Sequence, residues 1–174
     1  MQQNSQNFKL FACRYGFFSI YLIIDGRDNI IHLTFSKAGH RRVIKLLIGS
    51  KHAVHVQKGK QQEFPFDSLL KDYFTGNLPR FSMKIQSPFI HAGTEFQKKV
   101  WTEIAKIPYG QTRTYGELAR AIGNPASARA VGSACGANPV ALIIPCHRVV
   151  GASGLGGFAG GVDIKEKLLE LEKK

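Results

Sequence analysis

Cys146 and His147 are adjacent in the segment Ile144–Val150, and they form the pair of side chains best suited to nucleophilic chemistry in this chain. A thiolate attacks carbon far better than a thiol, and an ordinary cysteine with a pKa of about 8.5 is mostly protonated at neutral pH. A base that removes the proton would activate it. Adjacent residues of an extended chain point to opposite faces, so we expect a turn at Cys146 or a water between the two side chains.

Two other interpretations of this pair stay open at this stage. A buried structural cysteine beside a solvated histidine is the usual state of an isolated Cys-His pair. A metal site would need more ligands, and Cys135, Cys146 and His147 do not have the spacing of a zinc site. We therefore expect no metal.

The segment before the pair predicts two helices joined by a tight turn. Thr114 can cap the first helix, with Glu117 completing a capping box. Gly123, Asn124 and Pro125 supply the turn, with the asparagine as cap of the second helix and the proline at its first position. Two helices joined in this way can form a helix-turn-helix, whose second helix docks on DNA.

The second helix, predicted over 126–135, consists mainly of small residues, and Arg129 is its one long cationic side chain. Small side chains let a helix approach a surface closely, and a single arginine could reach into or between bases. A tight alanine-rich contact between two packed helices would explain the same pattern without DNA.

The remaining patterns predict an α+β protein whose second half is mostly helical. Apolar, β-prone runs separated by turn signals predict an antiparallel meander in the first half, over Phe8–Phe11, Gly16–Ile24 and Ile30–Phe35. Helical spacing of apolar residues predicts helices over Arg41–Ile48 and Phe66–Phe74, and over Asp163–Glu172 at the end of the chain. Thr94 can cap a further helix with Phe96, Val100 and Ile104 on its apolar face. A linker ending at 87–89 divides the chain into predicted domains 1–88 and 89–174.

Composition narrows the classes of partner and compartment. The chain has 174 residues, 44% of them hydrophobic, which is enough for a core and argues against extensive disorder. Its 24 Lys and Arg against 12 Asp and Glu give a net charge of +12, which favours a polyanion such as nucleic acid or an anionic membrane surface. Three cysteines without a disulfide pattern, a polar N-terminus and no apolar run of about 20 residues indicate a cytoplasmic protein with no membrane span.

The complete set of motifs resembles the O6-alkylguanine-DNA alkyltransferases, also called methylated-DNA–protein-cysteine methyltransferases. The similarity runs from about Thr94 to Glu172, and the first half is only compatible with the variable N-terminal domain of that family. The matching segments are 114–119 (TYGELA), 123–125 (GNP), 128–132 (ARAVG), 138–139 (NP), 145–150 (PCHRVV), 158–161 (FAGG) and the closing helix 165–172.

The resemblance implies direct repair of alkylated double-stranded DNA. Cys146 would take the alkyl group from guanine O6, with thymine O4 as a further candidate, while His147 accepts the thiol proton through a water and Glu172 polarises His147. Tyr115 would donate a proton to the guanine ring, and Asn138 would tie the active-site turn to the recognition helix. The thioether product has no good leaving group, so each molecule, expected to be a monomer, would react once. No cofactor would be required.

The resemblance also implies how the DNA is held. The helix-turn-helix would enter the minor groove and the damaged guanine would rotate into a pocket, since a stacked base hides its reacting atom. Arg129 would fill the gap in the stack and Tyr115 would help to displace the nucleotide. The implied DNA-binding residues are Phe96, Tyr115, Gly116, Asn124, Arg129 and Ser133. The implied pocket residues are Val149, Gly156, Ala159 and Gly160.

Three departures from the family pattern bear on affinity and substrate range. Gly136 stands where a basic residue is common, Ala159 where serine is common, and the glycine-rich loop 151–161 is one residue shorter. Two other functions remain alternatives: a regulator or damage sensor that binds alkylated DNA without transfer, and a thiol hydrolase that uses Cys146 and His147.

Overall fold

The computed structural model describes residues 6–49, 54–77 and 87–173, and its first part is a four-stranded sheet of order β3-β2-β1-β4. The strands are β1 (Gln6–Tyr15), β2 (Phe18–Asp25), β3 (Ile30–Thr34) and β4 (Val54–Lys58). The antiparallel pairing of β1 with β2 and of β2 with β3 confirms the predicted meander.

A fourth strand that the sequence analysis did not predict makes the sheet mixed, because β4 pairs with β1 in parallel. The helix α1 (Lys37–Ile48) lies between β3 and β4 in sequence. A crossover of this kind lets a strand return in the direction of its partner, whereas a tight hairpin cannot. The short run Val54–Lys58 carries no local signal of such a long-range pairing.

The helices of the first half lie close to the predicted segments. The helix α1 begins four residues before the predicted Arg41, because the side chain of Ser36 accepts a hydrogen bond from the backbone N–H of Gly39 at 3.1 Å. The helix α2 (Asp67–Phe74) begins one residue later than predicted and follows a short 3-10 turn, η1 (Gln61–Glu63).

The second half is helical, as predicted. Its helices are α3 (Pro88–His91), α4 (Glu95–Ala105), α5 (Tyr115–Ala121), α6 (Ala128–Gly136) and α7 (Val162–Glu172), and two short parallel strands, β5 (Arg113–Thr114) and β6 (Val149–Val150), pair between them. Both predicted caps are confirmed, because the side chains of Thr94 and Thr114 each accept a hydrogen bond from the backbone N–H three residues on. In turn, the side-chain oxygens of Gln97 and Glu117 accept hydrogen bonds from the backbone N–H groups of Thr94 and Thr114.

The turn of the helix-turn-helix differs in detail from the prediction. Gly123 has φ +76°, a left-handed conformation that suits glycine, and a 3-10 turn η2 (Pro125–Ser127) precedes α6, which therefore begins at Ala128 and not at 126. The side chain of Asn124 does not cap the helix. Instead its backbone carbonyl accepts hydrogen bonds from the N–H of Ser127 at 3.0 Å and from the Ser127 hydroxyl at 2.6 Å.

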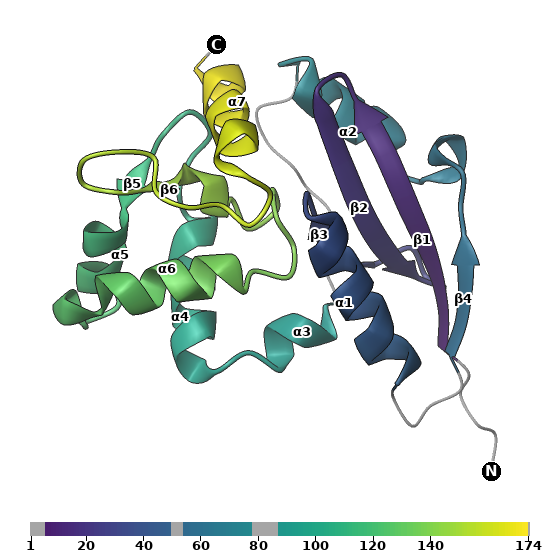
Figure 1. Ribbon diagram of the computed structural model, residues 1–174, viewed down its shortest axis with the longest axis horizontal. Helices are drawn as coiled ribbons and strands as arrows, with labels where there is room; N and C mark the ends of the chain where they lie inside the picture. Colours follow the sequence, from purple (N-terminus) through teal and green to yellow (C-terminus); the bar gives the residue numbers. More distant parts are fainter. Residues whose placement is uncertain (1–5, 50–53, 78–86, 174) are drawn as a thin grey trace.

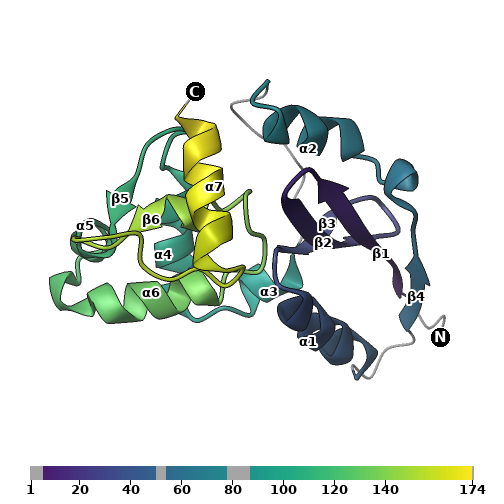
Figure 2. The same cartoon turned by 45° about the horizontal axis from the view of Figure 1, so that its top comes forward.

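The two halves pack against each other over one continuous core. Figures 1 and 2 show two neighbouring groups of elements: the sheet, with α1 and α2 packed on its opposite faces, and beside it the helices α4 to α7. The core cluster joins residues from both halves, including Leu33 on β3, Trp101 on α4 and Cys146. Trp101 also donates its indole N–H to the carbonyl of Ala134 at 2.8 Å, which fixes α4 against α6. None of the helices in the described ranges is long and apolar enough to cross a membrane.

Two buried histidines predict how stability depends on pH. Burial lowers the pKa of both His32 and His40 from 6.5 to about 4, so the unfolded chain binds more protons than the folded one between these values. Burial also lowers the pKa of His147. We expect the melting temperature to fall as the pH drops from about 6.5 to about 4, and a His40→Phe variant to show a shallower fall. A melting temperature independent of pH over this range, measured by circular dichroism, would contradict the assignment.

Candidate active site

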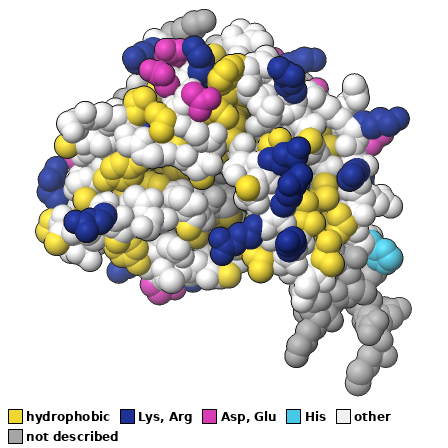
Figure 3. Space-filling model, viewed as in Figure 1, with side chains coloured by type: hydrophobic (Ala, Val, Ile, Leu, Met, Phe, Trp, Pro, Cys, Tyr) yellow, Lys and Arg dark blue, Asp and Glu magenta, His cyan; other side chains and the backbone are white. Residues whose placement is uncertain are grey.

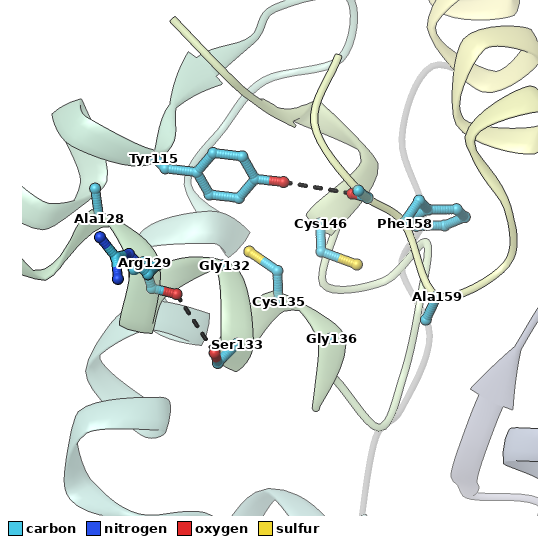
Figure 4. Close-up of a pocket in the computed structure, with 11 residues that line it drawn as sticks. Tyr115, Ala128, Arg129, Gly132, Ser133, Cys135, Gly136, Cys146, Phe158 and Ala159 are labelled. Atoms are coloured by element: carbon cyan, nitrogen blue, oxygen red, sulfur yellow. Dashed lines mark hydrogen bonds between the residues drawn. The ribbon is translucent and has the colours of Figure 1, made fainter. Parts of the chain in front are cut away.

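A cavity of about 530 Å³ opens beside the helix-turn-helix, between α6, the start of α5 and the loop that follows β6. Figure 4 shows the side chains around it, with the sulfur atoms of Cys135 and Cys146 on its wall. The lining residues are Tyr115, Ala128, Arg129, Gly132, Ser133, Cys135, Gly136, Cys146, Gly157, Phe158 and Ala159. The small residues of α6 thus form one wall of the cavity, and Cys146 is part of its lining.

Cys146 begins a 3-10 turn, η3 (Cys146–Arg148), so the chain does turn at the cysteine. The residue is 6% exposed. The side-chain amide of Asn138 donates to Cys146 Sγ at 3.1 Å and to the carbonyl of Ile144 at 2.7 Å, and its oxygen accepts the N–H of Val140 at 3.1 Å. Asn138 therefore holds both ends of the segment between α6 and the cysteine.

Burial raises the pKa of the Cys146 thiol, and the hydrogen bond from Asn138 and the nearby charge of Lys165 oppose this shift without reversing it. The cysteine is consequently a thiol at neutral pH. A reaction at its sulfur needs a base that accepts the proton as the new bond forms.

His147 has the properties of such a base, although no hydrogen bond joins it directly to the sulfur in the described structure. Its side chain is fully buried, and burial lowers its pKa, so the imidazole is neutral. Nε2 lies 2.8 Å from Glu172 Oε1, and because a carboxylate can only accept, the proton sits on Nε2 and Nδ1 keeps its lone pair. Nδ1 is buried without a hydrogen-bond partner among the described residues.

Glu172 is held by more groups than the sequence indicated. Burial opposes its ionisation, but hydrogen bonds from His147, Arg148 and Tyr73 prevail and bring its pKa to about 2. Arg148 donates from Nε and Nη2 at 2.8 and 2.9 Å, and the Tyr73 hydroxyl donates at 2.5 Å. The carboxylate is therefore ionised and fixed, which orients His147.

The sequence analysis assigned no role to Arg148 or Tyr73. Arg148 lies in the quoted motif directly after His147, but the closing helix holds four acidic residues and the sequence did not show which of them it would pair with. Tyr73 comes from α2, 99 residues before Glu172, and no local pattern connects them.

Lys165 is a second buried charge that the sequence analysis did not assign to the site. It is fully buried, and Nζ donates to the carbonyls of Val149 and Leu155, both at 2.5 Å, and of Gly157 at 3.3 Å. Burial lowers its pKa. The signal was present in the spacing of α7, since Lys165, with Leu168, Leu169 and Glu172, forms one buried face at helical intervals.

Of the four predicted pocket residues, Ala159 lines the cavity, whereas Val149, Gly156 and Gly160 do not. Gly157 and Phe158, which were not predicted, also line it. Val149 is fully buried in the core. Gly156 has φ +69° and lies under Tyr115, where a Cβ would come within 2.7 Å of the ring, and Gly160 packs against Phe35. Gly156 and Gly160 therefore allow close packing of the loop, and Val149 belongs to the core.

The predicted DNA-binding residues lie at different places on the second half. Tyr115, Arg129 and Ser133 line the cavity, and the Tyr115 hydroxyl donates to the carbonyl of Gly157 at 3.3 Å. Asn124 is exposed in the turn, Gly116 is half-buried near the start of α5, and Phe96 is half-buried and packs against the core. On the face drawn in Figure 3, Lys and Arg side chains lie over both halves, and Asp and Glu side chains are fewer.

We expect a Glu172→Gln variant to react with free O6-benzylguanine roughly a hundredfold or more slowly than the unaltered protein, since an amide cannot stabilise a protonated His147. The matched control is Glu170→Gln, which removes an exposed carboxylate of the same helix that pairs with Lys167 at 3.3 Å. Single-turnover rates measure both. Equal rates for the two variants would remove the orienting role of Glu172.

Within the described ranges, no three His, Cys, Asp or Glu side chains come together in a group that could hold a metal ion. The arrangement consists of a buried thiol in a cavity, an amide donor on its sulfur and a neutral histidine oriented by an ionised carboxylate.

Known proteins are similar to this chain in both sequence and fold. Residues 95–174 match the family model described as 6-O-methylguanine DNA methyltransferase, DNA binding domain. The chain is 57% identical over 104 residues to the methylated-DNA–protein-cysteine methyltransferase of Methanosarcina acetivorans, a match that spans 59% of this chain and 64% of that relative. It is 45% identical over 138 residues to the protein of the same name from Methanosarcina mazei, over 72% of this chain and 85% of the relative.

Solved structures extend the similarity over nearly the whole chain. The crystal structure of Mycobacterium tuberculosis O6-methylguanine methyltransferase superposes with a TM-score of 0.77 at 36% identity, over 95% of this chain and 93% of that one. A structure of Mycobacterium tuberculosis OGT in complex with DNA gives a TM-score of 0.73 at 37% identity, over 96% and 92%. With the motifs, the fold and these matches in agreement, the chain belongs to the methylated-DNA–protein-cysteine methyltransferase family.

Proposed function

We propose that this protein repairs alkylated double-stranded DNA by moving the alkyl group from guanine O6 to Cys146, with thymine O4 as a further candidate. The observation that carries the proposal is the position of Cys146 at a cavity lined by α6 of the helix-turn-helix, with Asn138 on its sulfur. A nucleophile in a cavity beside a DNA-binding helix suits chemistry on a base that has left the stack.

In the proposed reaction, Cys146 Sγ forms a bond to the alkyl carbon while the bond from that carbon to O6 breaks. The electron pair of the broken bond goes to the guanine. The thiol proton passes through a water to Nδ1 of His147, whose positive charge Glu172 stabilises. Tyr115 donates a proton at the guanine ring, so that guanine leaves as a neutral base, and the proton that His147 took from the thiol returns through solvent to the tyrosinate, which leaves both side chains neutral. The carbon–sulfur bond of the product has no good leaving group, and the protein is consumed.

We further propose that α6 enters the minor groove, because its exposed side chains other than Arg129 are short. Arg129 would take the place of the extruded nucleotide, and the pocket would receive the flipped guanine. Residues 89–174 would carry DNA binding and transfer, and residues 1–88 would form a structural domain. The protein would act as a monomer in the cytoplasm, where the three free thiols Cys13, Cys135 and Cys146 would stay reduced.

The experiment that tests the proposal is mass spectrometry of the protein after incubation with a duplex that contains O6-methylguanine. The proposal predicts a gain equal to one CH2 unit, located by peptide mapping on Cys146. Tight binding to the modified duplex without any gain in mass would identify a damage sensor instead.

A further inference from the structure

The edge of the N-terminal sheet continues into the segment that leads to the active site. The N–H of Leu33 on β3 donates to the carbonyl of Pro139 at 3.0 Å, and the N–H of Ala141 donates to the carbonyl of Leu33 at 2.8 Å. These bonds form a parallel bridge between Leu33 and Val140. Residues 139–141 thus add to the sheet beside β3, its edge strand.

His32 makes a third bond to the same segment through its side chain. Its Nδ1 lies 2.7 Å from the carbonyl oxygen of Pro139, and the residue is only 4% exposed. A carbonyl oxygen can only accept, so Nδ1 carries the proton and donates it. The carbonyl of Pro139 is therefore held from two directions, by the His32 ring and by the Leu33 backbone.

The segment needs this support because its backbone is strained. Leu142, three residues after Pro139, has φ +68°, a conformation that is unfavourable for a residue other than glycine and persists only where the surrounding structure fixes it. Asn138 directly precedes Pro139, and its amide donates to Cys146 Sγ at 3.1 Å. A shift of the Pro139 peptide would therefore move the donor away from the sulfur.

We propose that His32 is a positioning residue for the transfer reaction: by donating to the Pro139 carbonyl, it holds Asn138 in the place where its amide stabilises the sulfur of Cys146 as negative charge develops. This inference rests on the proposed alkyl transfer to Cys146. It gives the N-terminal half a part in the chemistry of the second half, exerted through Pro139 and Asn138.

The test compares His32→Leu, which removes the donor, with His32→Asn, whose Nδ2 can take the place of Nδ1. The side chains whose charge or hydrogen bonding is coupled to the ionisation of Cys146 are Asn138, Lys165, Cys135 and Tyr115. Because His32→Leu should displace Asn138, we expect the rate of Cys146 alkylation at pH 7 to fall roughly fivefold or more and the pH profile of this rate to move to higher pH. His32→Asn should restore both the rate and the profile.

The matched control is His40→Leu. His40 is also buried, with 7% of its surface exposed against 4% for His32, and its ring stacks on His32 with centroids 6.0 Å apart. No hydrogen bond joins it to residues 138–146 in the described structure. It should lower the melting temperature by a comparable amount and leave the pH profile of Cys146 unchanged. Equal pH profiles for His32→Leu and His40→Leu would overturn the proposal.

Two electrophiles keep this test separate from that of the proposed function. The rates are measured with free O6-benzylguanine and with iodoacetamide, and Cys146 is followed by peptide mapping. Iodoacetamide reports the ionisation of the thiol even if the protein transfers nothing from guanine. Should His32→Leu fail to fold, the 15N shifts of the His32 ring in the unaltered protein decide: a proton on Nδ1 supports the proposal, and a proton on Nε2 alone overturns it.

Discussion

A Cys146→Ala variant takes up no alkyl group from a duplex containing O6-methylguanine, while it still binds that duplex. Removal of a covalent nucleophile costs about a millionfold in rate in other enzymes, and the loss here should be of that order. The substitution removes only the sulfur at the end of a small side chain, so the wall formed by α6 stays in place and affinity for DNA should change little.

The matched control is Cys135→Ala, since Cys135 lines the same cavity. Burial raises the pKa of its thiol to about 12, so it supplies almost no thiolate at neutral pH. We expect transfer by Cys135→Ala at a rate close to that of the unaltered protein. Residual transfer by Cys146→Ala, or its loss in Cys135→Ala, in a labelled-methyl assay would show that the nucleophile has been assigned to the wrong cysteine.

An Arg129→Ala variant repairs duplex DNA much more slowly than the unaltered protein, but reacts with free O6-benzylguanine at a similar rate. Arg129 is exposed at the rim of the cavity, on the second residue of α6, and an extruded base leaves a gap that its side chain could fill. Unstacking a base costs a few kcal/mol, so a loss of about 2–3 kcal/mol would slow duplex repair roughly 30- to 150-fold.

The comparison of the two substrates separates a role in base extrusion from damage to the cavity, because the free base needs no extrusion. Lys167→Ala, which removes an exposed cation from α7, controls for the general effect of charge on DNA affinity. If Arg129→Ala lowers both rates by the same factor, the arginine acts on the cavity and has no special part in extruding the nucleotide.

Local features of the sequence predicted the elements around the site well. The caps at Thr94 and Thr114 and the capping box at Thr114 were predicted because they involve residues at most three positions apart, whereas the box that Gln97 completes at Thr94 was not predicted. The pairing of β4 with β1 depends on a crossover through α1, and the 3-10 turn before α6 depends on how the chain leaves Gly123. Both are decided by packing, which a short window of sequence does not contain.

The residues of the site also fall into two groups, those that the sequence predicted and those that the fold brings in from distant segments. The sequence contained Cys146 and His147 as neighbours and Glu172 at the end of a predicted helix. The groups that fix Glu172 come from distant segments, with Tyr73 on α2 and the backbone N–H of Gly110 between α4 and α5. Gly156 was predicted to line the pocket but supports Tyr115 from below, because the curvature of a glycine-rich loop determines which residue faces the cavity.

The central claim is that Cys146 is consumed by its own reaction, and the most direct test is the number of alkyl groups taken up by each protein molecule. The protein is incubated with a large excess of duplex carrying labelled O6-methylguanine until the reaction stops. The structure and the proposed chemistry predict a plateau at one mole of label per mole of protein, all of it on Cys146. Continued loss of O6-methylguanine beyond one equivalent would contradict the claim, because it would show that the thiol is regenerated.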